Sequence, residues 1–294
     1  MFPLLKKLIA LLLAAVSSWL TPVTVLTTQP LAKNAIYQEI TIMNYNVYVA
    51  GSGKTSPKNR TDEVVQMIRE QSPDSFGIEE ADEGWRQRLQ EALPEYGSTG
   101  LGRNKNDSGE ASPVFYLKEK YELVDSKTIW LSRTPEKPSR GWDAMLNRVA
   151  TIAVLRDRET GFTYAHINTH FDNVGSISRC EAVAIISREA EQLSDLPCVF
   201  TGDLNAKDDT LMYQRIQESG FQDTRELAEQ SDTGATYHGY RELDKWNDRP
   251  IDYIFVNGYC QSVAVYQILD QKINGIYPSD HYPVVSRLTM AYNP

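Results

Sequence analysis

The chain has 294 residues, 41% of them hydrophobic, and a formal net charge of −9 at pH 7. A chain of this length and composition can bury a substantial core, which excludes a disordered or low-complexity protein. The acidic balance argues against tight, sequence-independent binding of nucleic acid, because such binding requires a cationic surface. The 3 cysteines have no Cys-x-x-Cys spacing, so we expect core residues rather than a disulfide framework or a zinc site.

The first 35 residues have the composition of a targeting segment. Two lysines precede an apolar run from Leu8 to Val16, and small residues follow it. This order is typical of a secretory signal peptide. The uncharged stretch continues to Thr28 and is long enough, at roughly 20 residues, to span a bilayer if it is not cleaved. We therefore predict an exported protein, secreted or extracytoplasmic, with a membrane anchor at residues 1–35 as the alternative, and a single domain over residues 36–294.

Strand-like and helix-like segments alternate along residues 36–294. Amphipathic patterns predict helices over 59–71, 83–93, 178–193 and 210–219, the first with Thr61 as its N-cap. Runs of β-branched and aromatic residues predict strands over 40–49, 74–80, 110–116, 121–130, 148–155, 161–168, 198–202 and 251–256, and a closing strand after Pro283. The polar segments 97–109 and 131–142 are rich in glycine or proline, so we expect loops there.

Five of these apolar strands end in, or contain, polar residues that are costly to bury without a partner. In chain order they are Asn46, Glu80, Asn168 with His170, Asp203 with Asn205, and Asp252, and Asp280 with His281 precedes the closing strand. Each alone is more often a solvated side chain, a turn or a satisfied structural residue. Together they form a set suited to phosphoryl chemistry, which uses oxygen ligands for Mg²⁺ and a histidine held by a buried carboxylate.

The motifs at these positions resemble those of the DNase I-like endonuclease/exonuclease/phosphatase superfamily, in the same order and over roughly residues 38–290. They stand here as Asn44-Tyr45-Asn46-Val47, Gly77-Ile78-Glu79-Glu80, Asn168-Thr169-His170, Gly202-Asp203-Leu204-Asn205, Ile251-Asp252-Tyr253-Ile254 and Ser279-Asp280-His281-Tyr282-Pro283. The segment from Trp130 to Arg148 is similar to a bacterial branch near the deadenylase and nocturnin group. The resemblance implies an α/β four-layer sandwich, in which two mostly antiparallel sheets pack face to face between helices.

The resemblance also implies roles for the residues at the strand ends. The implied ligands of a Mg²⁺ or Mn²⁺ ion are Glu80, Asn46 and Asp280. The implied catalytic residues are His170, Asp203, Asn205, Asp252 and His281. Among them, Asp203 would position or deprotonate the attacking water and His170 would contact the scissile phosphate, whereas His281 would act together with Asp252. Which residue is the general base stays open.

Several basic and aromatic residues lie in or near the strand-end loops. We expect substrate contacts from Asn168, Arg148 and Arg179, and further phosphate-binding candidates are Arg103, Arg140 and Arg249. Trp142 and Trp246 either stack on the substrate or pack under their own loops. Two positions depart from the family pattern, because Glu79 replaces the usual glutamine and Asn173 replaces a histidine common in this branch.

We predict from these features a divalent-metal-dependent phosphoesterase, with a phosphodiesterase or nuclease as the leading activity. A phospholipid, as in sphingomyelinases, and a sugar or inositol phosphate are the alternative substrates. A non-catalytic binding protein on the same fold is an alternative of a different class. We expect a phosphoester substrate, with nucleic acid as one candidate, membrane contact only through an uncleaved N-terminus, and a monomer.

Overall fold

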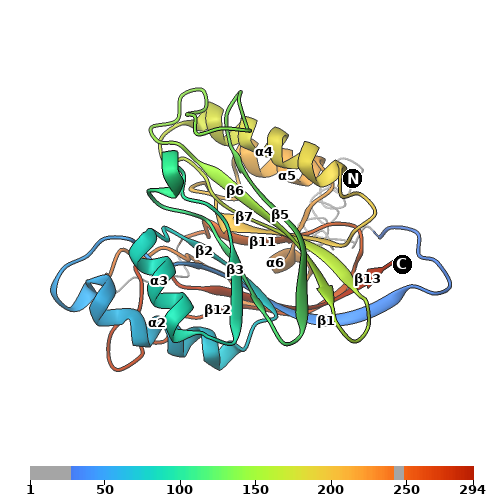
Figure 1. Ribbon diagram of the computed structural model, residues 1–294, viewed down its shortest axis with the longest axis horizontal. Helices are drawn as coiled ribbons and strands as arrows, with labels where there is room; N and C mark the ends of the chain where they lie inside the picture. Colours follow the sequence, from blue (N-terminus) through green and yellow to red (C-terminus); the bar gives the residue numbers. More distant parts are fainter. Residues whose placement is uncertain (1–27, 242–247) are drawn as a thin grey trace, which may run out of the picture.

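The computed structural model describes residues 28–241 and 248–294. Most of the expected targeting segment and Trp246 lie outside these residues. Two β-sheets pack face to face, and helices cover the outer face of each sheet (Figure 1). The α/β four-layer sandwich implied by the family resemblance is therefore confirmed. Within the described residues, no helix combines the length and the apolar composition needed to cross a bilayer.

One sheet has seven strands in the order β10-β12-β13-β1-β2-β4-β3, and the other has six in the order β5-β6-β7-β8-β11-β9. The strands of the first sheet are β1 (Ile36–Asn46), β2 (Ser75–Glu79), β3 (Tyr96–Thr99), β4 (Val114–Leu117), β10 (Gln230–Ser231), β12 (Cys260–Ile268) and β13 (Val284–Tyr292). The strands of the second are β5 (Tyr121–Trp130), β6 (Val149–Asp157), β7 (Thr163–His170), β8 (Cys198–Asp203), β9 (Gln222–Asp223) and β11 (Asp252–Val256). Most neighbours are antiparallel, and the parallel pairs are β1–β2, β7–β8 and β10–β12.

The helices bury their apolar faces on the outer sides of the sheets. α2 (Pro57–Gln71) and α3 (Glu83–Ala92) pack on the seven-stranded sheet. α4 (Ser176–Glu191) and α5 (Leu211–Glu218) pack on the six-stranded sheet, and the short α6 (Thr224–Leu227) contacts β11 and β12 (Figure 1). The prediction of Thr61 as the N-cap of α2 was wrong. The N-cap is Ser56, five residues earlier, and Pro57 starts the helix because its fixed φ suits the first helical position.

A chain of buried polar groups crosses the otherwise apolar space between the sheets. His166 Nδ1 lies 2.8 Å from Ser75 Oγ, and His166 Nε2 lies 2.8 Å from Thr201 Oγ1. Thr201 in turn donates to Asn168 Oδ1 at 2.8 Å. Gly77 permits this close approach, because a Cβ atom there would lie 2.2 Å from the amide oxygen of Asn168. These linked hydrogen bonds set the spacing between β2, β7 and β8, the three strands that lead into the site.

Candidate active site

The strands bring their polar residues to one edge of the sandwich. β1 and β2 run parallel, as do β7 and β8, so the carboxyl ends of each pair lie at the same edge. β11 runs antiparallel to β8 and begins with Asp252 opposite Asp203. The side chains surround a cleft of about 430 Å³. Its lining residues are Tyr48, Glu80, Arg103, Glu110, Leu146, Arg148, His170, Asn173, Asp203, Asn205, Tyr237, Ile251, Asp280 and His281.

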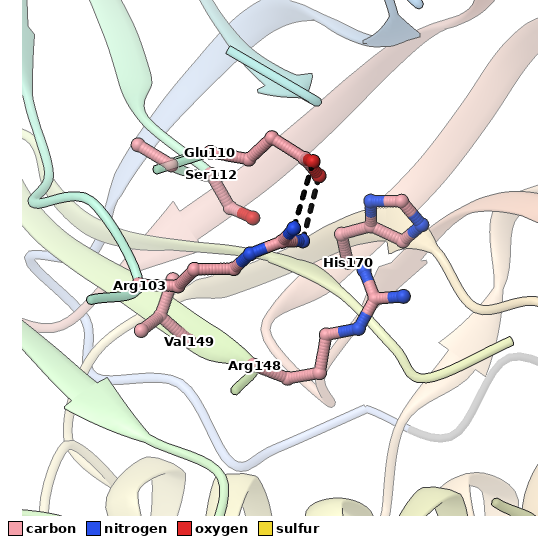
Figure 2. A pocket seen from close by; sticks show the side chains of 7 residues that line it. Arg103, Glu110, Ser112, Arg148, Val149 and His170 are labelled. Atoms are coloured by element: carbon pink, nitrogen blue, oxygen red, sulfur yellow. Dashed lines mark hydrogen bonds and ion pairs between the residues drawn. The ribbon is translucent and has the colours of Figure 1, made fainter. Parts of the chain in front are cut away.

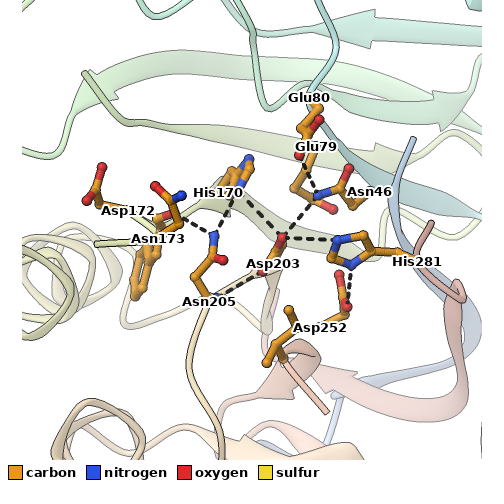
Figure 3. A network of polar contacts seen from close by, with 12 residues as sticks. Asn46, Glu79, Glu80, His170, Asp172, Asn173, Asp203, Asn205, Asp252 and His281 are labelled. Atoms are coloured by element: carbon orange, nitrogen blue, oxygen red, sulfur yellow. Dashed lines mark hydrogen bonds and ion pairs between the residues drawn. The ribbon is translucent and has the colours of Figure 1, made fainter. Parts of the chain in front are cut away.

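His281 and Asp252 form a buried pair in this site. His281 Nδ1 lies 2.9 Å from Asp252 Oδ2, and His281 Nε2 lies 3.8 Å from Asp203 Oδ2 (Figure 3). Burial disfavours the charged imidazole, but the neighbouring carboxylates, Asp252 first among them, outweigh burial and raise the pKa of His281 to about 10. The imidazole is therefore protonated at neutral pH and faces Asp203.

Asp203 lies at the centre of the network (Figure 3). Its Oδ2 accepts a hydrogen bond from Asn46 Nδ2 at 3.0 Å and lies 3.5 Å from His170 Nε2. Its Oδ1 accepts one from the backbone N–H of Asn205 at 2.9 Å. Burial and then the charge of Asp252 raise the pKa of Asp203 to about 7. A carboxylate whose pKa lies near neutral pH can accept a proton from water at that pH, as a general base must.

Asn205 and His170 form a second contact beside Asp203. Asn205 follows β8 with a left-handed backbone, at φ 49°, which turns its amide back toward β7. Its Nδ2 lies 2.9 Å from His170 Nε2 and donates to the carbonyl oxygen of Phe171 at 3.0 Å. Burial and then the charge of Arg148 hold the pKa of His170 well below its usual range, so this imidazole is neutral.

Glu80 and Asp280 supply the carboxylates of the cleft wall. Glu80 Oε1 accepts from Asn46 Nδ2 at 3.2 Å and Oε2 accepts from the backbone N–H of Val49 at 2.8 Å. Burial raises the pKa of Asp280 to about 6; the charge of His281 opposes this rise and the charge of Glu80 adds to it. The negative charges of Glu80 and Asp280 repel one another, and a cation between them would relieve this repulsion. Their carboxylate oxygens are the hard ligands that a divalent cation such as Mg²⁺ or Mn²⁺ prefers.

Asp203, Asp252 and His281 also offer ligand atoms within 4.8 Å of one another. This triad fits a metal less well than the carboxylate wall does. His281 is charged and bonded through Nδ1 to Asp252, so it has no lone pair to offer an ion. The donor chemistry therefore favours Glu80 and Asp280, with Asn46 beside them.

Some predicted substrate contacts lie elsewhere in the structure. Asn168 is fully buried, with its amide nitrogen bonded to the carbonyl oxygens of Ile78 and Pro113, so it joins the sheets beneath the cleft and cannot contact a substrate. Arg179 does not line the cleft but donates to the carbonyl oxygen of Asp172 at 2.7 Å. Arg148 and Arg103 do line it.

The other basic and aromatic candidates also lie outside the cleft. Arg249 pairs with Asp208 and Asp209 on the surface. Arg140 and Trp142 line a separate shallow depression, where Trp142 packs against the core beneath its own loop. Of the two roles considered for Trp142, the structure places it in the packing role.

Several residues of the cleft were missed by the sequence analysis. They are Tyr48, Glu110, Leu146, Tyr237 and Ile251. Tyr237, which is 42% exposed, pairs with His281 in an isolated β-bridge, and its ring centroid lies 4.9 Å from that of His281. The sequence shows Tyr237 only as an aromatic residue in a loop close to the motif residues. It does not show that this loop packs against His281.

Glu79 replaces the usual glutamine without adding a charge to the site. It is fully buried, and its Oε2 accepts from Asn44 Nδ2 at 3.1 Å. Burial and then the charges of Asp252 and Asp203 raise its pKa well above the usual range. A carboxyl group kept neutral in this way has the same shape and polarity as the glutamine amide that it replaces.

Comparisons with known proteins agree with this geometry. The model of the Endonuclease/Exonuclease/phosphatase family matches residues 43–281. An endonuclease/exonuclease/phosphatase of Bacteroides vulgatus is 31% identical, with a TM-score of 0.82 over 86% of this chain and 99% of that chain. A mannosyl-6-phosphatase of Bacteroides thetaiotaomicron is 28% identical, with a TM-score of 0.80 over 85% of this chain and 99% of that chain.

The human nocturnin catalytic domain shares the fold at 19% identity, with a TM-score of 0.65 over 88% of this chain and 97% of that chain. No curated protein matches the chain significantly. Members of the matched family are hydrolases that act on phosphoester bonds and generally depend on a divalent metal. Both the family model and the bacterial structures cover most of the domain, so the chain belongs to the endonuclease/exonuclease/phosphatase family.

Proposed function

We propose that this protein is a divalent-metal-dependent hydrolase of a small phosphoester, with a sugar phosphate as the leading substrate class. The observation that carries the proposal is the arrangement around Asp203. This carboxyl group, whose pKa is raised, lies next to the His281–Asp252 pair and beside the carboxylates of Glu80 and Asp280, which line the same cleft. Such a set matches the requirements of attack by water on phosphorus.

Each residue has a role that follows from its surroundings. Asp203 holds the attacking water and takes its proton, since its pKa lies near neutrality. His281, kept protonated by Asp252, donates one hydrogen bond from its Nε2–H to a phosphoryl oxygen or to the leaving oxygen. Glu80 and Asp280, with Asn46 beside them, would hold the metal ion. When bound there, a Mg²⁺ or Mn²⁺ ion supplies Lewis acidity.

The shape and charge of the cleft support a small substrate over a nucleic acid. Its volume of about 430 Å³ is in the range of small-molecule sites. Arg103 is paired with Glu110 and Arg148 with Asp172, so the described residues offer no run of unpaired cations along the cleft that would follow a polynucleotide backbone. The relative that cleaves mannosyl 6-phosphate, according to its name, supports the same choice.

The test is a substrate panel with purified protein and Mg²⁺ or Mn²⁺: mannose 6-phosphate, an aryl phosphomonoester, an aryl phosphodiester and supercoiled plasmid. EDTA and His281→Gln serve as controls for contaminating enzymes. We expect metal-dependent release of inorganic phosphate from the monoesters and none in the variant. Plasmid nicking that exceeds monoester turnover and disappears in His281→Gln would favour the second candidate, a nuclease or phosphodiesterase.

We also propose that the protein acts outside the cytoplasm, on the strength of the lysines and apolar run in residues 1–28. Fractionation of cells that express the full chain tests this proposal. Recovery of the full-length protein in the cytosol would contradict both export and anchoring.

A further inference from the structure

The lining of the cleft has a charged part and an uncharged part. The charged part includes an ion pair in which Arg103 donates to both carboxylate oxygens of Glu110, at 2.7 and 2.8 Å (Figure 2). The uncharged part includes Tyr48, Tyr237 and Ile251. A phosphoryl group is an anion, so a metal ion and charged side chains hold it. The alcohol to which the phosphate is esterified therefore meets the uncharged part of the lining.

Tyr237 presents an exposed aromatic ring beside the reacting groups. The residue is 42% exposed, and its ring centroid lies 4.9 Å from that of His281, at an interplanar angle of 57°. A single exposed aromatic residue on a protein surface needs no explanation. This one lines the cleft and lies against the histidine that faces Asp203, so a substrate placed for attack passes close to its ring.

Backbone hydrogen bonds hold the segment that carries Tyr237. The backbone N–H of Tyr282 donates to the carbonyl oxygen of Thr236 at 2.6 Å, and the backbone N–H of His238 donates to that of Asp280 at 2.9 Å. Asp280 and Tyr282 flank the catalytic histidine in the sequence. The aromatic ring is thus attached to the same rigid backbone as the reacting groups, and a rigid contact loses little conformational entropy when a ligand binds.

Tyr48 is the other aromatic residue of the lining, and its ring is engaged within the protein. It lies edge-to-face with the ring of Tyr240, with centroids 5.7 Å apart, and the guanidinium of Arg60 lies 5.5 Å from its centroid. Trp85 Nε1 also donates to the carbonyl oxygen of Tyr48 at 3.2 Å. Tyr48 therefore supports the wall of the cleft, whereas Tyr237 is the aromatic residue with a ring exposed to a ligand.

We infer that Tyr237 selects phosphoesters of ring-shaped alcohols, because its exposed aromatic face binds the apolar face of a sugar ring. The inference rests on the proposed function, since it concerns the alcohol part of the same substrate. One face of a pyranose ring presents C–H bonds, which the electron-rich face of an aromatic ring attracts while both surfaces leave water. An open-chain polyol has no fixed apolar face and loses more conformational entropy on binding. Tyr237 is a specificity-determining residue and not a catalytic one.

A matched pair of substrates tests this selection. Mannose 6-phosphate and mannitol 6-phosphate carry the same phosphate on a primary oxygen, but only the first has a ring. We expect the wild type to prefer the ring in kcat/KM by about tenfold, which is the size of one aromatic contact. The preference should fall to about onefold in Tyr237→Ala and persist in Tyr237→Phe. Tyr37→Ala is the control, since Tyr37 lies in β1, is 59% exposed and does not line the cleft.

The ratio of the two substrates separates selection from an indirect effect on His281. Tyr237→Ala removes a side chain that lies against the catalytic imidazole, so kcat can fall for both esters. Tyr237→Gln keeps a side chain of similar length there without an aromatic face, and it should also lose the preference. An equal fall for both esters, with the preference intact, would show that Tyr237 acts only through His281 and would overturn the inference. Thermal unfolding confirms that each variant is folded.

Binding without turnover separates the failure of this inference from the failure of the proposed function. Calorimetric titration with each ester in the presence of EDTA reports the preference for the ring. If no ester is hydrolysed but the ring ester binds more tightly and Tyr237→Ala removes the difference, the ring site stands and the proposed function falls. If the esters are hydrolysed without a preference, or with one that Tyr237→Ala keeps, the function stands and the inference falls. A protein that neither hydrolyses nor binds either ester would overturn both.

Discussion

His166 links the stability of the sandwich to pH. It is fully buried, with both ring nitrogens 2.8 Å from hydroxyl groups, and burial lowers its pKa to about 3. In the unfolded chain a histidine has a pKa of about 6.5. Between these values the unfolded state binds a proton that the folded state does not, so the free energy of unfolding falls as the pH decreases below 6.5. At pH 5 the loss from this one group is about 2 kcal/mol, which is 1.36 kcal/mol per unit over about 1.5 units.

Urea unfolding of the wild type and His166→Gln at pH 7 and pH 5, followed by circular dichroism, tests this value. At pH 7 the variant is less stable, because Ser75 and Thr201 lose a partner that fits both of them, at a cost of about 1–3 kcal/mol. At pH 5 the difference narrows by about 2 kcal/mol, since only the wild type carries the protonation penalty. All other titrating groups are common to both proteins and cancel in the difference.

Ser75→Ala is the matched control, since it removes one hydrogen bond of His166 and keeps the imidazole. Its stability difference from the wild type should change little between the two pH values. The assignment of a neutral His166 between the sheets would be refuted by one result. In that result, the free energies of unfolding of the wild type and His166→Gln differ equally at both pH values, or differ more at pH 5.

Three further perturbations test the site and the sheet interface. Asp252→Asn removes the charge that keeps His281 protonated. We expect kcat to fall about 10²-fold and the alkaline limb of the pH–rate profile to move to lower pH. An alkaline limb that does not move would contradict the pairing. Gly77→Ala places a methyl carbon 2.2 Å from the Asn168 amide oxygen and should cost about 1–3 kcal/mol in urea unfolding; unchanged stability would mean that the strands separate freely. Mg²⁺ should raise the Tm of the wild type and of the exposed control Glu83→Gln, but not of Glu80→Gln; a shift retained in Glu80→Gln would place the ion elsewhere.

Much of the site was predictable because its signals are local. A carboxylate such as Asp252 inside an apolar strand is costly without a partner, so its presence indicates one, and the structure supplies His281 at 2.9 Å. Asp203 and Asn205 likewise follow directly from the end of an apolar run. Glu79 shows the limit of this reasoning: it is read from the sequence as a charge, and only its burial keeps it neutral.

The missed strands lack the local pattern that identifies a strand. β12 has two register irregularities in its pairing with β13, between Cys260 and Ser262 and between Val263 and Val265, so the alternation of apolar and polar residues is interrupted. β3 is a short edge strand, Tyr96–Thr99, at the start of the segment expected to be a loop. Long-range pairing determines both strands.

The order of polar residues along the apolar strands determined, by itself, the family, the sandwich and most residues of the site, because each strand carries its own functional group. Only the tertiary structure decided which arginines reach the cleft. In the sequence, Arg148 and Arg179 both lie near strand-end loops, but Asp172 accepts from Arg148 through its carboxylate and from Arg179 through its carbonyl oxygen. The first bond leaves the Arg148 guanidinium in the cleft and the second holds Arg179 away from it, and only the folded arrangement around Asp172 determines which arginine meets which of its oxygen atoms.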